Sequence, residues 1–105
     1  MDFLLKSFED NLRRETKEMS LLDASDYIMT KMADGIDSEY SSEIAGICSK
    51  VFKEKYDYTL DKVLTIVIWG QIKERDVIVK VAMDQGFTEK AANSIANQVI
   101  EKIKA

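Results

Sequence analysis

The sequence contains no histidine and no proline, and only one of its 105 residues is a cysteine. Without histidine, the His-assisted serine and cysteine nucleophiles are excluded, and the commonest metal ligand is missing. A single cysteine forms no intrachain disulfide. Glycine occurs at only four positions, which match neither a phosphate-binding loop nor a dinucleotide fingerprint. We therefore expect no enzymatic activity, no cofactor and no metal, and a chain of helices joined by short connections.

Long apolar runs are missing as well. The longest, Val63–Trp69, is interrupted by Thr65 and falls far short of the ~18 apolar residues of a membrane span. The first ten residues are too charged for a signal peptide. These features predict a chain without a membrane span and with a cytoplasmic location.

The chain does contain apolar residues at helical spacing, at 46% hydrophobic and 32% charged composition. This is typical of a folded chain with a single core. We predict an all-α fold, a compact bundle of five or six short helices, with residues 1–105 as one helical domain. In the second predicted helix, Leu22 and Ile28 belong to the buried face. The third helix has the clearest apolar stripe, and Cys48 lies on it, as expected for a small buried hydrophobic residue.

The stretch Leu60–Ile72 contains the only tryptophan, Trp69, and the densest apolar run. Its contrast with the amphipathic segments on both sides predicts a central helix buried on more than one side. We expect Tyr56–Tyr58 to form a linker before it and Thr59 to cap it. Because Val63–Trp69 is rich in β-branched residues, a buried strand is the alternative.

The two halves of the chain contain a similar sequence pattern, an internal repeat that we call the echo. Shifting the sequence by 51 residues aligns Met32–Asp37 with Met83–Thr88, each a helix end with a glycine, an apolar residue and a capping residue. The chain is then two three-helix units, residues 1–54 and 55–105, related by a pseudo-twofold axis. The alternative is that capping physics dictates this pattern wherever a glycine-terminated helix precedes a capped helix.

Charge and surface aromatics point to a protein partner. Residues 1–54 hold 7 basic and 12 acidic side chains, whereas residues 55–105 hold 8 and 7, so the excess of negative charge lies in the first half. We predict a non-catalytic protein-binding or regulatory module, whose partner is another protein or a second copy in a homodimer. The acidic half favours a basic partner, through Asp23, Asp26, Asp34 and Asp37. The candidate interface anchors are Phe3, Leu4, Tyr56 and Tyr58.

One segment supports an alternative function. Val81–Ile95 resembles the helix-turn-helix motif of DNA-binding regulators: an alanine stands four residues before Gly86, and an apolar residue and a capping residue follow the glycine. The resemblance implies a small DNA-binding regulator that uses residues 77–99. Its outward groups for phosphates or base edges would be Thr88, Lys90, Asn93, Ser94 and Asn97. A structural αα-hairpin without DNA binding is the other interpretation of this segment, since Gln85 stands where the motif prefers an apolar residue.

Overall fold

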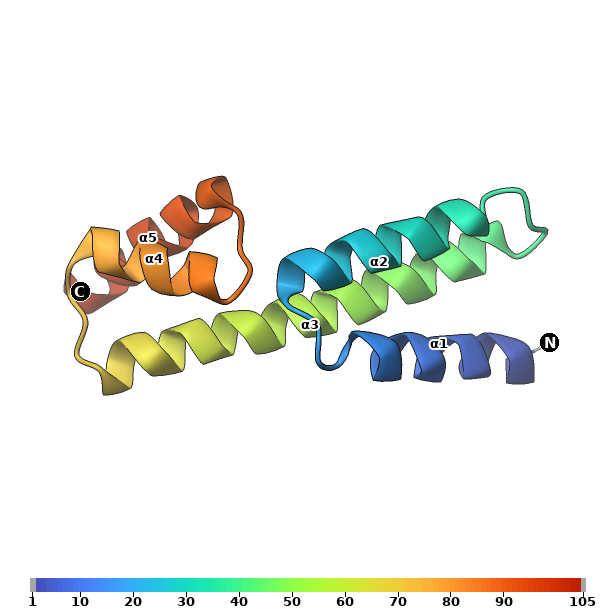
Figure 1. Ribbon diagram of the computed structural model, residues 1–105, viewed down its shortest axis with the longest axis horizontal. Coiled ribbons are helices and arrows are strands. Elements are labelled where there is room, and N and C mark those ends of the chain that lie inside the picture. Colours follow the sequence, from blue (N-terminus) through green and yellow to red (C-terminus); the bar gives the residue numbers. More distant parts are fainter. Residues whose placement is uncertain (1, 105) are drawn as a thin grey trace. The chain divides into compact units, whose positions relative to one another are not determined.

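A computed structural model describes residues 2–104, which form five α-helices and no β-strand (Figure 1). The all-α prediction is therefore confirmed. The helices are α1 (Asp2–Thr16), α2 (Leu21–Asp34), α3 (Ser41–Trp69), α4 (Arg75–Asp84) and α5 (Glu89–Lys104).

The chain divides into two compact units, residues 1–56 and 57–105. Unit 1 contains α1, α2 and the first part of α3, and unit 2 contains the rest of α3 with α4 and α5. The turns that the echo aligns are built differently, because Gly35 has φ −94° whereas Gly86 has φ 104°. The single domain and its duplication about a pseudo-twofold axis stay predictions.

The predicted linker at Tyr56–Tyr58 is wrong. α3 runs without a break from Ser41 to Trp69, and Thr59 is a buried residue inside it rather than a cap. No glycine or proline stands between Gly46 and Gly70, so the chain contains nothing that would stop helical hydrogen bonding there. The strand alternative is wrong for the same segment.

The prediction of a helix around Trp69 that is buried on several sides is also wrong. Trp69 is 84% exposed and Ile68 is 68% exposed, whereas Val63 and Val67 are fully buried. The buried residues are four apart, so they share one face of the helix, and the exposed pair lies at its C-terminal end. The stretch is a one-sided amphipathic segment.

The core of unit 1 is formed by one or two side chains from each helix: Leu12 of α1, Ile28 of α2, and Cys48 and Val51 of α3. Cys48 is fully buried, as predicted. Around these four pack the half-buried Phe8, Tyr27, Met32, Ile44, Ile47 and Phe52. The predicted apolar stripe of α3 thus faces the core. At the start of α2, the Ser20 hydroxyl accepts a hydrogen bond from the Asp23 N–H, 3.2 Å away, and caps the helix.

In unit 2, α4 and α5 pack against each other through small side chains, among them the buried Ala82, Ala92 and Ala96. Gly86, in the left-handed region, ends α4, and the next N–H donates to the Ala82 carbonyl at 3.1 Å. Thr88 caps α5, as predicted, by accepting from the Ala91 N–H at 3.2 Å. α4 begins at Arg75, and Asp76 lies in its first turn.

Candidate functional site: an apolar groove between α2 and α3

Three large apolar side chains of α2 and its C-terminal connection project into solvent. Leu22, Met29 and Ile36 are 51%, 65% and 71% exposed. Leu22 and Met29 are seven residues apart, which is two turns of a helix, so they lie in one line along α2, and Ile36 lies in the turn that follows the helix. We call these three residues the seam. The prediction that Leu22 belongs to the buried face is wrong. Ile28 lies on the buried face, and Met29, which is in line with Leu22, lies about 100° further round the helix.

Two residues of the seam, Met29 and Ile36, line a groove between α2 and α3, whereas Leu22 lines neither part of it. One part, of about 520 Å³, is lined by Met29, Met32, Ala33, Ile36, Ser41, Ser42 and Ala45. A second part, of about 300 Å³, is lined by Ser25, Ile28, Met29, Met32, Cys48, Ser49 and Phe52. Both parts are lined by Met29 and Met32 and lie along the same two helices, and we call them together the α2–α3 groove. No residue of α1 lines it.

The α3 wall of the groove is built from small side chains. Ser42, Ala45 and Ser49 follow one another three and four residues apart, so they lie along one face of α3. Side chains of this size allow the backbone of a second helix to approach closely. Phe52 closes this wall at one end, and its ring lies 6.2 Å from that of Tyr56 in a tilted arrangement.

The lining of the α2–α3 groove is mostly apolar. Its floor contains Cys48, whose burial raises the pKa of the thiol and keeps it neutral. The other lining groups are apolar side chains and serine hydroxyls. Among residues 2–104 there is also no group of three or more side chains placed to hold a metal ion. Met29 and Met32 adapt readily to different apolar partners.

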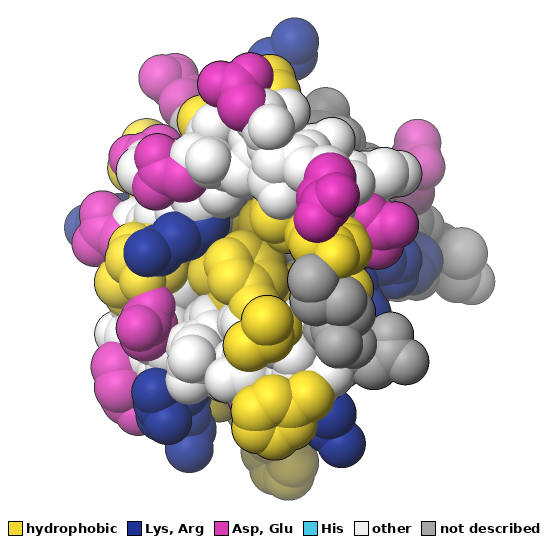
Figure 2. All heavy atoms as spheres, turned by 90° about the vertical axis from the view of Figure 1, so that its right-hand side faces the viewer, with side chains coloured by type: hydrophobic (Ala, Val, Ile, Leu, Met, Phe, Trp, Pro, Cys, Tyr) yellow, Lys and Arg dark blue, Asp and Glu magenta, His cyan; other side chains and the backbone are white. Residues whose placement is uncertain are grey.

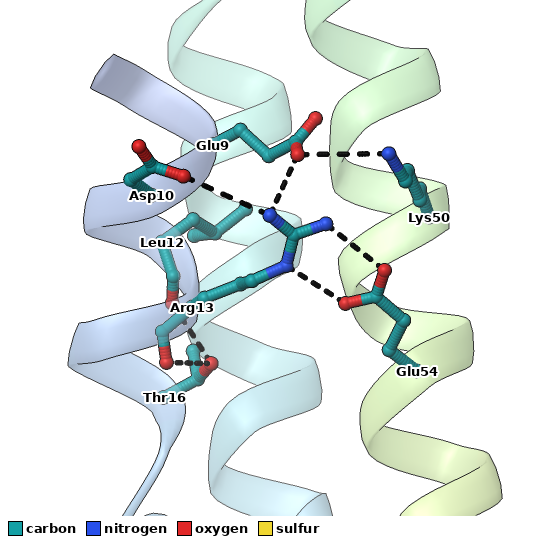
Figure 3. Close-up of polar contacts among 7 residues, drawn as sticks. All are labelled: Glu9, Asp10, Leu12, Arg13, Thr16, Lys50 and Glu54. Carbon is teal, nitrogen blue, oxygen red and sulfur yellow. Dashed lines mark hydrogen bonds and ion pairs between the residues drawn. The ribbon is translucent and has the colours of Figure 1, made fainter. Parts of the chain in front are cut away.

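An exposed charge cluster fixes the edge of unit 1 where α1 meets α3 (Figure 3). Arg13 of α1 donates two hydrogen bonds to Glu54 of α3, at 2.8 and 2.9 Å, and its third nitrogen lies 2.6 Å from Glu9. Lys50 approaches Glu9 at 3.6 Å. The hydrogen bonds from Arg13 hold the pKa of Glu54 below its ordinary value. Every member has an opposite charge nearby, so this cluster is a structural clamp between two helices.

The predicted interface anchors lie on two helices, Phe3 and Leu4 on α1 and Tyr56 and Tyr58 on α3. Phe3 and Leu4 are exposed at the start of α1, Tyr56 is half-buried against Phe52, and Tyr58 is exposed and falls in unit 2. Figure 2 looks onto the side where α1 begins and the α2–α3 connection lies, and it shows hydrophobic side chains gathered at its centre with acidic side chains mostly above them. Their role as anchors stays a prediction.

The residues of the DNA-binding alternative are partly engaged within unit 2. The side-chain oxygens of Asn93 and Asn97 accept hydrogen bonds from Arg75 of α4, at 2.7 and 2.8 Å. The Asn93 amide nitrogen also donates to the carbonyl of Glu89. The sequence motif did not identify Arg75 as the partner of Asn93 and Asn97, because Arg75 lies 18 residues before Asn93.

Of the other three residues of this alternative, Thr88 is exposed but serves as the cap of α5, while Lys90 and Ser94 are exposed on α5. The structure therefore leaves Lys90 as an outward cation, and the two asparagines are engaged by Arg75 at the surface of unit 2. The DNA-binding role itself stays a prediction.

Comparison with known proteins adds no relative: no family model matches the sequence, and neither a curated protein nor a solved structure matches it. Within the described residues, 2–104, the helices are too short or too polar to cross a membrane.

Proposed function

We propose that this chain is a non-catalytic protein-binding module, located in the cytoplasm, whose unit 1 holds an amphipathic helix of a partner protein in the α2–α3 groove. The observation that carries the proposal is the pair of exposed seam residues that line that groove, Met29 and Ile36, with the exposed Leu22 two turns before Met29 on α2. Apolar side chains in line at heptad spacing are what a helix presents to another helix.

The geometry favours a helix over other ligands. α1, α2 and α3 supply three helices of unit 1, and a fourth helix laid in the groove would give the arrangement of a four-helix bundle. The small residues on the α3 wall and the methionines on the α2 wall suit a rod of helical diameter with apolar anchors at positions i, i+3 or i+4, and i+7. Exposing the three seam residues to water is unfavourable, and a docked helix would remove that cost.

The test is a pull-down after nuclease treatment with three forms of the protein. The first is the natural chain, and the second carries Leu22→Gln, Met29→Gln and Ile36→Gln. The control carries Ile68→Gln and Trp69→Gln, which alter exposed apolar residues of unit 2. We expect a stoichiometric protein that the natural chain and the control retain and the seam variant loses.

Because all five substituted side chains are largely exposed, the variants should keep the far-ultraviolet circular dichroism of the natural chain. A partner retained equally by the seam variant would show that the α2–α3 groove is not the binding site. Nucleic acid recovered without protein, and released by nuclease or added salt, would favour the DNA-binding alternative on α5 instead.

A further inference from the structure

Three side chains that contain sulfur line the α2–α3 groove, and they differ in how far solvent reaches them. Met29 is 65% exposed, Met32 is half-buried and Cys48 is fully buried. Met29 is also the most exposed of the methionines whose side chains the structure describes, since Met83 is 43% exposed and Met19 is half-buried. The methionine most open to solvent is therefore one that lines both parts of the groove.

This difference in exposure decides which of the three sulfurs a peroxide oxidises first. A methionine thioether has no proton to lose before it reacts, so its rate of oxidation follows its access to solvent. The Cys48 thiol reacts only as the thiolate, and its burial both raises its pKa and shields it. Hydrogen peroxide should therefore oxidise Met29 before Met32 and Cys48.

The product at Met29 is a sulfoxide. A lone pair of the Met29 sulfur attacks one oxygen of hydrogen peroxide, so that an S–O bond forms and the O–O bond breaks. The transferred oxygen gives its proton to the departing hydroxide, which leaves as water. The sulfur loses two electrons and the peroxide gains them, and a flexible apolar side chain becomes a polar one.

A sulfoxide at position 29 is tolerated in the free chain and unfavourable under a docked helix. In the free chain the new oxygen is hydrated, because the side chain is largely exposed. A helix in the groove would remove that water. Met32, Ala33 and Ile36 line the same part of the groove and have no hydrogen-bond donor in their side chains, and the serine hydroxyls of this part stand on the α3 wall. Burial of a polar group without a hydrogen bond costs free energy.

We infer that Met29 is a reversible oxidation site that controls the α2–α3 groove: the thioether accepts a partner helix, and the sulfoxide weakens its binding. This inference rests on the proposed function, since it needs a helix in that groove. Methionine sulfoxide reductases restore the thioether, with a dithiol oxidised to a disulfide and water released. Because a docked helix covers Met29, binding should in turn protect its sulfur from peroxide.

The probe is a helical peptide from a displayed library with leucine at the two apolar positions of every heptad. It is selected on the unoxidised natural chain, and peptides that also bind the Leu22→Gln, Met29→Gln, Ile36→Gln variant are discarded. Peptide affinity is measured before and after treatment with hydrogen peroxide for the natural chain, Met29→Leu and Met83→Leu. Each form is compared with itself before treatment. Met83→Leu is the matched control, because Met83 is an exposed methionine of unit 2.

We expect mass spectrometry of proteolytic fragments to find the sulfoxide at Met29 before Met83, Met32 and Met19. As it forms, the natural chain and Met83→Leu should bind the peptide about tenfold more weakly, whereas Met29→Leu should keep the affinity it had before treatment. Far-ultraviolet circular dichroism should not change, and a methionine sulfoxide reductase should restore binding. Saturating peptide should slow the oxidation of Met29 and leave that of Met83 unchanged.

The failures of the inference and of the proposed function are distinguishable. If Met29→Leu loses as much affinity as the natural chain, if Met29 is oxidised no faster than Met32, or if the Met29 sulfoxide leaves the affinity unchanged, the inference is overturned and the groove stays a helix site. Loss of the circular dichroism signal on oxidation would also overturn it, since the effect would then be unfolding. If no library peptide distinguishes the natural chain from the seam variant, the proposed function fails and the inference fails with it.

Discussion

Gly46 offers a direct test of the α3 surface next to the groove. It lies inside a 29-residue helix, is exposed, and a Cβ built there meets no atom within 4 Å. Alanine is favoured over glycine in a helix interior by about 0.8–1 kcal/mol. Because the new methyl group neither collides nor becomes buried, Gly46→Ala should raise the free energy of unfolding by about that amount. For a unit of this size the melting temperature should rise by about 4–8 °C.

Gly86→Ala is the matched counterpart, because Gly86 has φ 104° and an alanine there is strained by about 1–2 kcal/mol. Urea unfolding, monitored by far-ultraviolet circular dichroism, measures the free energy of unfolding of both variants. The slope of that free energy against urea concentration should not change if only stability changes. We expect shifts of opposite sign. A destabilising Gly46→Ala would mean that another surface packs closely on α3 at this point, which contradicts the open space beside Gly46.

Three further predictions concern other parts of the chain. Trp69→Ala should lower the free energy of unfolding by less than about 1 kcal/mol, because the side chain is 84% exposed; a loss of about 3 kcal/mol or more in the same urea assay would show that it is buried. Alanine substitution of Arg13 and Glu54, singly and together, should give a coupling free energy of about 0.5–1 kcal/mol. Since the folded pKa of Glu54 is lowered, that coupling should be full above the ordinary glutamate pKa and fade as the pH falls through the folded value; a pH-independent coupling would contradict this. Gln71 has φ 51° at the end of α3, so Gln71→Gly should stabilise unit 2 by about 0.5–1 kcal/mol, and a loss of thermal stability would refute that reasoning.

Local signals in the sequence predicted much of the helical framework. The stripe that contains Cys48 identified the buried face of α3, and the order of Gly86 and Thr88 located the turn between α4 and α5. These features depend on periodicity and capping, which act over a few residues. The prediction of a helix break at Tyr56–Tyr58 was wrong. Aromatic and acidic residues by themselves do not end a helix, and this segment contains no glycine, proline or competing cap.

The exposure of side chains depends on which helix covers which face, and a single sequence does not contain that information. Trp69 was predicted to be buried from hydrophobicity alone, yet its side chain is 84% exposed. The candidate site did leave a signal, since Leu22, Met29 and Ile36 stand at heptad spacing. Ile28 and Met32 form a second apolar face of α2 that overlaps the first. The sequence does not say which of the two faces packs in the core with α1, and in the structure it is the face of Ile28 and Met32.

The most direct measurement is site-specific photo-crosslinking inside cells that express the chain naturally. A photoreactive phenylalanine analogue replaces Met29 in the α2–α3 groove or, as the control, the exposed Ile68 of unit 2. We expect position 29 alone to crosslink to one partner protein, and mass spectrometry to locate the attachment in an amphipathic helical segment. The same proteins captured from both positions, or no partner captured from position 29, would contradict a helix-binding groove.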